Sequence, residues 1–197
     1  MINKEQILVV PVNYTSYIKN GFTGASSIST ARSYSLYDST GVYEPIYKIE
    51  NNICFIKISI MLLFKQDNKF LVKELYDTTK RPCLEIGVNS YIKPVSGHYN
   101  AIYNQINRIL QFDLSIDPDT VNINFIGFIR DLTNNSVKST LGCIYYIDTA
   151  GFTIQSDSDI YQYKWYTLTE LIDRYSKSTS WSKKITDCLI EKTIKIN

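Results

Sequence analysis

Polar side chains that could hold a phosphate gather in one stretch of the chain. Asn104, Gln105 and Arg108 follow one another at helical spacing, and Lys93 stands in the segment before them. A guanidinium makes paired hydrogen bonds to phosphate, and an ammonium adds a compact positive charge. The sequence therefore predicts a ligand-binding set at these four residues. Arg108 would also suit a solvated helix face or a structural ion pair.

Tyrosines accompany this set. Tyr91 comes just before Lys93, and Tyr99 and Tyr103 lie at the start of the helical stretch. An aromatic ring can stack on a nucleobase, and tyrosine also packs well in interfaces between proteins. We expect Tyr91 and Tyr103 to complete the ligand-binding set, with ordinary packing as the alternative. A bound phosphate is expected over the N-terminal part of the helix, where free N–H groups favour an anion.

Hydrolytic chemistry would need residues that are scattered here. Metal-assisted attack by water requires clustered carboxylates, because Mg²⁺ takes hard oxygen ligands in octahedral geometry. No Asp or Glu stands between residues 99 and 112. His98 is the one histidine and follows no nucleophile motif, so a surface position is expected for it. We expect no catalytic residue and no metal ligand, and nearby acids are candidates only as relocated ligands or as solvated and salt-bridge residues: Glu85, Asp113, Asp117, Asp119 and Asp131.

Apolar spacing predicts the helix that would carry the ligand-binding set, from Tyr99 to Phe112. Ile102, Ile106, Ile109 and Leu110 recur at i, i+4, i+7 and i+8, which makes one apolar stripe. Such a stripe packs against a sheet, so these four side chains are expected to be buried.

Strands are predicted on both sides of that helix. A nearly continuous apolar run, rich in β-branched residues, indicates a strand from Ile53 to Phe64 that is buried on both faces. Further strands are predicted at Ile7–Val12, Val42–Ile49, Lys69–Leu75, Pro82–Ile92, Val121–Arg130, Leu141–Asp148 and Tyr163–Tyr166. Residues 20–43 have weak periodicity and are predicted to form a loop region. Thr167 and Glu170 have the spacing of a capping box that begins a helix, and a last helix is predicted from Ser180 to about Lys192.

The composition narrows the class of protein. Hydrophobic residues make up 44% of the 197 residues and charged residues 20%, as in a globular protein. A net charge of +2 without a long basic run argues against a nucleic-acid partner. Four cysteines without a C-x2-C pair indicate reduced thiols and no zinc site. The longest apolar run is too short to span a bilayer and no signal peptide is visible, so a cytoplasmic protein is expected. The abundance of Ile, Asn, Lys and Tyr fits the AT-rich genome of a low-GC bacterium or of a phage that infects one.

Several motifs occur in an order that resembles a known family. In chain order they are a V-L-V-V-P-like strand at Ile7–Pro11, a G-F-x-G turn at Gly21–Gly24, a G-I-G-G-H-I-like stretch at Ile86–Ile92, a G-x-I-x-D-x-x-N-x-V-like segment at Gly127–Val137, an L-G-x-x-Y segment at Leu141–Tyr145 and an E-S-W-S-like segment at Thr179–Ser182. This order resembles the bacterial and phage branch of Nudix-like proteins labelled predicted phosphoesterases, over roughly residues 7 to 190.

The Nudix box itself resembles the segment Leu84–Leu114 only in degenerate form. The box reads G-x5-E-x7-R-E-U-x-E-E-x-G-U, where U is a bulky apolar residue, and its two U positions fall on Ile106 and Phe112, which both fit. Its charged and glycine positions fall on residues of other kinds: Ser90, Ser96, Asn104, Gln105, Arg108, Ile109 and Gln111. The apolar skeleton is kept, while the carboxylates that would bind magnesium are replaced.

The resemblance implies an α/β fold, a Nudix-like α/β/α sandwich with a mixed central sheet. It implies a single domain over residues 1–197, in which residues 1–45 form an N-terminal strand plus an extended loop region packed on it. The function first expected is a catalytically inactive domain that acts as a protein-interaction or assembly module, with a protein as partner. Two alternatives stay open. One is a binder or sensor of a nucleotide derivative, ADP-ribose-like or a dinucleotide, in the retained cleft. The other is a divergent phosphohydrolase with relocated ligands, the one case in which magnesium would be a cofactor.

Overall fold

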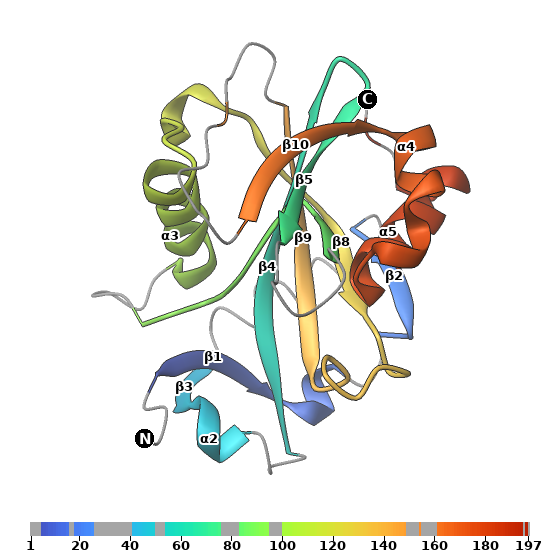
Figure 1. Ribbon diagram of the computed structural model, residues 1–197. Helices are drawn as coiled ribbons and strands as arrows, with labels where there is room; N and C mark the ends of the chain where they lie inside the picture. Colours follow the sequence, from blue (N-terminus) through green and yellow to red (C-terminus); the bar gives the residue numbers. More distant parts are fainter. Residues whose placement is uncertain are drawn as a thin grey trace.

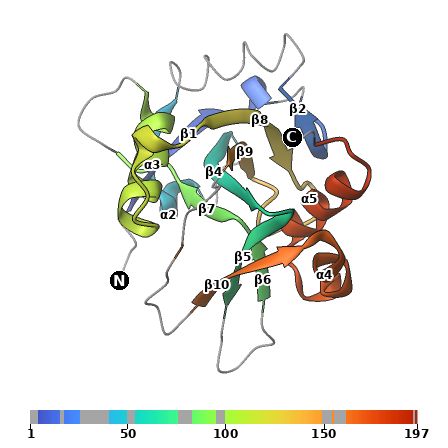
Figure 2. The same cartoon turned by 90° about the horizontal axis from the view of Figure 1, so that it is seen from above.

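The computed structural model describes residues 5–15, 18–25, 41–49, 54–75, 83–94, 100–148, 154, 161–194 and 196. A mixed sheet lies between helices on its two faces (Figures 1 and 2). Helix α3 (Ala101–Arg108) packs on one face, and α4 (Leu168–Asp173) and α5 (Ser180–Ile190) pack on the other. The expected α/β/α sandwich with a mixed sheet is confirmed.

Two long parallel strands form the centre of the sheet. They are β4 (Phe55–Gln66) and β9 (Thr140–Asp148), paired from Lys57 to Lys65 on β4. Antiparallel neighbours extend the sheet in the order β10–β5–β4–β9–β8–β2, while β1 pairs with β3 and β4, β6 with β5, and β7 with β4. The other strands are β1 (Gln6–Pro11), β2 (Gly21–Gly24), β3 (Val42–Pro45), β5 (Lys69–Leu75), β6 (Cys83–Ile86), β7 (Val88–Tyr91), β8 (Ile123–Arg130) and β10 (Tyr161–Thr167).

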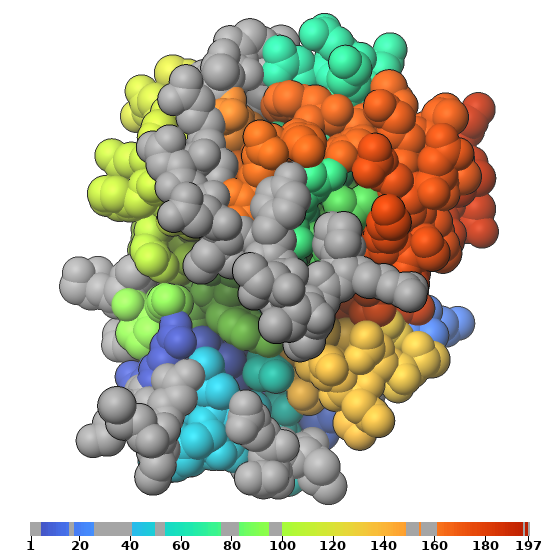
Figure 3. All heavy atoms as spheres, in the orientation of Figure 1, coloured from blue at the N-terminus to red at the C-terminus, as the bar shows by residue number. Residues whose placement is uncertain are grey.

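Strand β4 has the burial on both faces that its apolar run predicts. Every side chain from Ile58 to Phe64 is at most 4% exposed. Because strand side chains alternate, Ile58, Ile60, Leu62 and Phe64 face α3, whereas Met61 and Leu63 face α5. One strand therefore supplies both cores. On the surface, β10, α4 and α5 occupy neighbouring areas (Figure 3).

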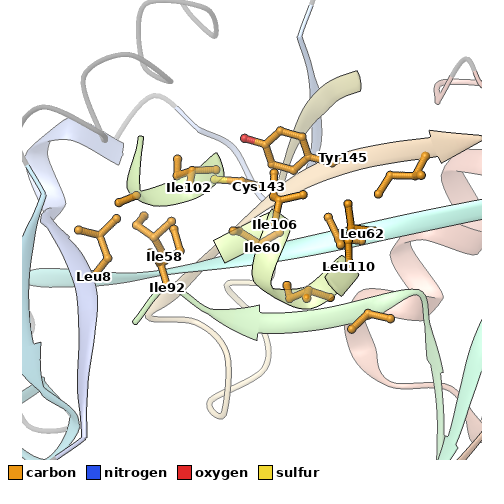
Figure 4. Close-up of a cluster of buried hydrophobic side chains, with 14 of the residues drawn as sticks. Leu8, Ile58, Ile60, Leu62, Ile92, Ile102, Ile106, Leu110, Cys143 and Tyr145 are labelled. Atoms are coloured by element: carbon orange, nitrogen blue, oxygen red, sulfur yellow. The ribbon is translucent and has the colours of Figure 1, made fainter. Parts of the chain in front are cut away.

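The predicted helical stripe forms the core between α3 and the sheet (Figure 4). Ile102, Ile106, Ile109 and Leu110 are all buried and belong to one cluster with alternate residues of β4 and β9. The stripe prediction is confirmed. Its burial is what holds α3 in place, because a helix of this length has little stability by itself.

The end of that helix corrects one expectation. After Arg108 the chain widens into a π-helical turn (Ile109–Asp113), in which the N–H of Leu114 bonds to the carbonyl of Ile109. A π turn rotates later side chains away from their α-helical directions. Leu110 keeps its predicted place in the core and Leu114 is buried as well, whereas Phe112, which fitted the second apolar position of the box, is 74% exposed.

Three further predictions differ from the structure. The predicted strand Val42–Ile49 ends at Pro45 and continues as the short helix α2 (Ile46–Ile49), and the predicted strand Pro82–Ile92 breaks at Gly87 into β6 and β7. The loop region 20–43 contains β2, which pairs with β8, and residues 26–40 lie outside the described residues.

The capping box of Thr167 and Glu170 is present at the start of α4. Short 3₁₀ turns occupy Val12–Thr15, Pro118–Thr120 and Tyr175–Lys177.

None of the helices in the described part of the chain is long and apolar enough to cross a membrane.

Candidate functional site

Gln105, one of the box residues, has a buried side chain that is hydrogen-bonded on both sides of its amide. Its side chain is only 1% exposed. The amide Nε2 donates to Ser90 Oγ at 3.1 Å, and Oε1 accepts from the backbone N of Lys93 at 3.4 Å. Ser90 Oγ in turn donates to the carbonyl of Tyr91. The amide thus ties α3 to β7 and to the segment that follows β7, and its oxygen is already engaged by protein.

The other members of the predicted ligand-binding set are not gathered at one point. Lys93 Nζ makes an ion pair with Glu5 Oε1 at 2.7 Å, with both side chains partly exposed. Asn104 and Arg108 are half-buried on α3, and Tyr103 is exposed there. Tyr91 follows Ser90 on β7 and so points to the opposite face of the sheet from Gln105. Ligand binding by this set stays a prediction.

Two of the acidic residues that remained as alternative metal ligands, Asp131 and Glu85, have other partners. Asp131, buried after β8, accepts from the N–H and the hydroxyl of Thr133 and pairs with Lys184 at 3.7 Å. Burial by itself would raise the Asp131 pKa, but the hydrogen bonds from Thr133 and Ser180 and the charge of Lys184 outweigh it and hold the pKa below its ordinary value. Glu85 Oε1 accepts from Asn89 Nδ2 at 2.8 Å.

These donors do not fit a magnesium ion. Among the residues that the structure describes, no three His, Cys, Asp or Glu side chains are grouped to hold a metal. At the box positions, α3 offers an amide whose oxygen already accepts a hydrogen bond, a guanidinium and an isoleucine. Mg²⁺ needs several free hard oxygen ligands instead. His98 and Ser96 lie outside the described residues.

A cavity of about 260 Å³ lies on the α5 face of the sheet. It is bordered by the N-terminus of α5, by β4, β6 and β7, and by the turn before β9. Of the predicted set only Tyr91 reaches it. Its lining is formed by Ser59, Glu85, Asn89, Ser90, Tyr91, Val137, Thr140, Thr179, Ser180 and Trp181. We name it the α5 cavity.

The walls of the α5 cavity are held by hydrogen bonds between α5 and β6. Thr179 caps the helix by accepting from the N–H of Ser182 at 3.3 Å, and its own N–H donates to the carbonyl of Leu84. The hydroxyl of Ser182, fully buried, accepts from the N–H of Ile86 at 2.9 Å. The first turn of α5 is therefore fixed against the sheet, and the cavity is framed by regular structure.

Sequence reasoning did not assemble the α5 cavity, although fragments of its signal were present. Trp181 belongs to the E-S-W-S-like segment, and Asn89 follows Gly87 in the G-I-G-G-H-I-like stretch. Thr140 carries no motif. Thr140 stands 51 positions after Asn89, and Trp181 stands 41 positions after Thr140. The pairing of β4 with β7 and β9 brings the first two segments together, and the hydrogen bond of α5 to β6 adds the third.

Comparison with known proteins identifies the fold. No protein-family model matches the chain, and no curated protein matches its sequence. Among solved structures, Tm1382, a protein assigned as a Nudix hydrolase, matches with a TM-score of 0.76 at 16% identity, over 95% of this chain and 100% of its own. A bifunctional NMN adenylyltransferase/ADP ribose pyrophosphatase from Francisella tularensis matches with a TM-score of 0.50 at 9% identity, over 82% of this chain and 46% of its own. A Nudix-family hydrolase from Clostridium perfringens matches with a TM-score of 0.47 at 13% identity, over 70% of this chain and 97% of its own. The chain has a Nudix-like fold.

Proposed function

We propose that this chain is a Nudix-fold domain that binds a nucleotide derivative and does not hydrolyse it. The observation that carries the proposal is α3. This helix keeps the buried apolar stripe that seats it on the sheet, while the box positions for metal ligands hold Gln105, Arg108 and Ile109. The side chains that pack α3 on the sheet are present, while the metal ligands of the box pattern are absent. A fold that keeps its shape without the metal ligands is suited to binding.

The polar residues that remain favour recognition over catalysis. Gln105 is engaged in bonds that position α3, and Arg108 places a permanent positive charge where the family pattern has a carboxylate. A guanidinium can pair with a phosphate directly, without a bridging cation. The Francisella protein, whose stated activity is ADP ribose pyrophosphatase, makes nucleotide derivatives the first ligands to test.

Mg²⁺ or Mn²⁺ is expected to leave the melting temperature unchanged and to support no hydrolysis of nucleoside triphosphates, ADP-ribose or dinucleoside polyphosphates. The reason is the missing carboxylate cluster on α3. Product chromatography with and without the metal, against an EDTA blank, measures turnover, and a thermal-shift screen of the same compounds without metal measures binding. Turnover that disappears in a folded Glu85→Ala or Asp131→Ala variant would show relocated ligands and restore the divergent hydrolase as the leading function.

A protein-interaction module is the second candidate, and Phe112 favours it. Phe112 is 74% exposed in the π turn that follows α3. Aromatic residues are enriched at the centres of protein interfaces. A pull-down from the native host should then retain a defined partner that Phe112→Ser loses and Gln111→Ser, the neighbouring exposed control, keeps. Equal retention by both variants would remove Phe112 from the argument.

A further inference from the structure

A second hollow lies where the start of α4 meets the end of α5, beside the turn from β4 to β5. It has a volume of about 360 Å³, and we name it the α4–α5 groove. It lies on the α5 face of the sheet, since its residues pack with the core cluster of that face, whereas α3 lies on the other face. Its walls are mostly apolar and are formed by Phe70, Leu168, Leu189, Ile194 and Ile196.

The apolar residues of the groove differ in depth. Phe70 and Ile194 are nearly buried, with 7% and 5% of their surfaces exposed, whereas Leu168, Leu189 and Ile196 are half-buried. An apolar hollow of this kind is filled best by a side chain that projects from a partner, because both surfaces then leave water.

Two exposed isoleucines stand next to groove residues on the two helices. Ile172 follows Leu168 by four residues and so shares its face of α4, and it is 45% exposed. Ile190 follows Leu189 on α5 and is 48% exposed. Exposed apolar surface that gathers in one place marks an interaction site. A ligand that filled only the groove would leave both isoleucines in water, so a larger partner fits this surface better.

The ionisable residues of the groove are lysines. Lys65 and Lys192 line it, and among the residues that the structure describes no Asp or Glu does so. Lys65 is paired with Phe70 across β4 and β5, so the two side chains share a face of the sheet. Lys65 Nζ lies 3.5 Å from the carbonyl oxygen of Ile196, which places the ammonium at the groove.

Acidic residues stand on the same two helices but outside the lining. The Glu170 carboxylate accepts from Thr167 in the capping box of α4, and Glu191 follows the end of α5. The charge that faces a partner inside the groove is therefore positive, and the complementary partner carries carboxylates.

We infer that the α4–α5 groove docks an acidic amphipathic segment of another protein. The segment inserts apolar side chains into the groove and sets carboxylates beside Lys65 and Lys192, as a helix with one apolar face and flanking Glu or Asp does. A second copy of this chain, docked through the same groove, would bring lysines against lysines, because such an interface is two-fold symmetric. The inference goes beyond the nucleotide binding proposed above, which concerns α3 on the other face of the sheet.

Two synthetic peptides of about 18 residues, long enough to be helical, supply the probes. Both carry leucines at helical spacing, and their polar positions alternate Glu with Gln in one and Lys with Gln in the other. Fluorescence anisotropy of each labelled peptide with the full chain at low salt measures the affinity. The acidic peptide is expected to bind at least about tenfold more tightly than the basic one and to weaken as salt is raised. Equal affinities, or no binding by the acidic peptide, would overturn the inference.

Lys192→Glu tests the charge of the groove, and Lys177→Glu is its matched control. Both lysines are exposed, but Lys177 lies in the turn between α4 and α5 and does not line the groove. Lys192→Glu is expected to weaken the acidic peptide about fivefold and to strengthen the basic one, because attraction becomes repulsion. Lys177→Glu should leave both affinities within about twofold. Equal effects of the two variants would mean that the peptides respond only to net charge, and the inference would be wrong.

Ile172→Ser tests the apolar surface, and Val42→Ser is its control. Each residue is 45% exposed, but Val42 lies on β3, which pairs with β1. Ile172→Ser is expected to weaken the acidic peptide about threefold, since apolar contact is lost, while Val42→Ser leaves it unchanged. Circular dichroism shows whether both variants fold. A folded Ile172→Ser protein that binds the acidic peptide as the wild type does would count against the docking surface.

Vesicles of phosphatidylcholine, with and without phosphatidylserine, distinguish a lipid surface from a protein partner. Sedimentation with the serine-containing vesicles that Lys192→Glu and Ile172→Ser abolish, without a preference between the peptides, would assign the surface to lipid and overturn the inference. None of these variants is expected to change nucleotide binding. Failure of the peptide experiment therefore leaves the proposed function standing, and a chain that binds no nucleotide leaves the groove inference standing.

Discussion

Replacing Ile106 by Asp is expected to lower the free energy of unfolding by about 4 kcal/mol or more, because it leaves an unpaired carboxylate in the core. Ile106 lies on α3 and is buried against β4 and β9 (Figure 4). For a chain of this length, such a loss corresponds to a fall in melting temperature of roughly 8–16 °C. Urea and thermal unfolding followed by circular dichroism measure both quantities.

Gln111→Asp is the control for that experiment. Gln111 is exposed in the π turn five residues later, so the same charge enters the same segment outside the core. A change within about 0.5 kcal/mol is expected there. An Ile106→Asp protein that unfolds at the wild-type temperature would mean that α3 does not pack through this face, and the register of the box helix would have to be redrawn.

The core of the fold could be predicted because its signals are local. The i, i+4, i+7 spacing of Ile102, Ile106 and Ile109 depends only on helical periodicity, and all three side chains are buried. The capping box from Thr167 to Glu170 depends on residues three apart, and it too is present.

Phe112 shows where local reasoning ends. Its apolar type fits the second apolar position of the box pattern, yet it is 74% exposed, and in the π turn from Ile109 to Asp113 it is Leu114 that is buried. Nothing in the residue types distinguishes an α from a π turn at this point. The second half of the predicted strand Val42–Ile49 differs for a related reason, since Ile46–Ile49 is too short for its periodicity to decide between helix and strand.

The α5 cavity was beyond prediction for a different physical reason. Its lining comes from separate strands and a helix, to which Asn89, Thr140 and Trp181 belong, and only the folded chain brings these residues together. A cavity between packed elements has no counterpart in spacing or composition. By contrast, the lack of Asp and Glu on α3 is a property of residue types, so the sequence alone shows it.

Gly87→Ala is expected to lower the free energy of unfolding by at least about 3 kcal/mol, from backbone strain and overlap acting together. Gly87 lies between β6 and β7 with φ at +72°, a conformation that L side chains rarely adopt. An added Cβ would overlap the carbonyl oxygen of Leu62 on β4, which is backbone in the central strand and cannot turn aside. The break at Gly87 also separates β6 from β7, which carries Asn89, a residue that lines the α5 cavity.

Gly21→Ala separates the two contributions to this loss. Gly21 also has a positive φ, of +102°, but nothing lies within 4 Å of the position that its Cβ would take. It should therefore show only the backbone term, about 1–2 kcal/mol. Chemical denaturation of both variants compares the two values directly. A Gly87→Ala loss no larger than that of Gly21→Ala would mean that β7 can move away from Leu62, and the tight approach of β4 to the strand break would not be what fixes the cavity wall.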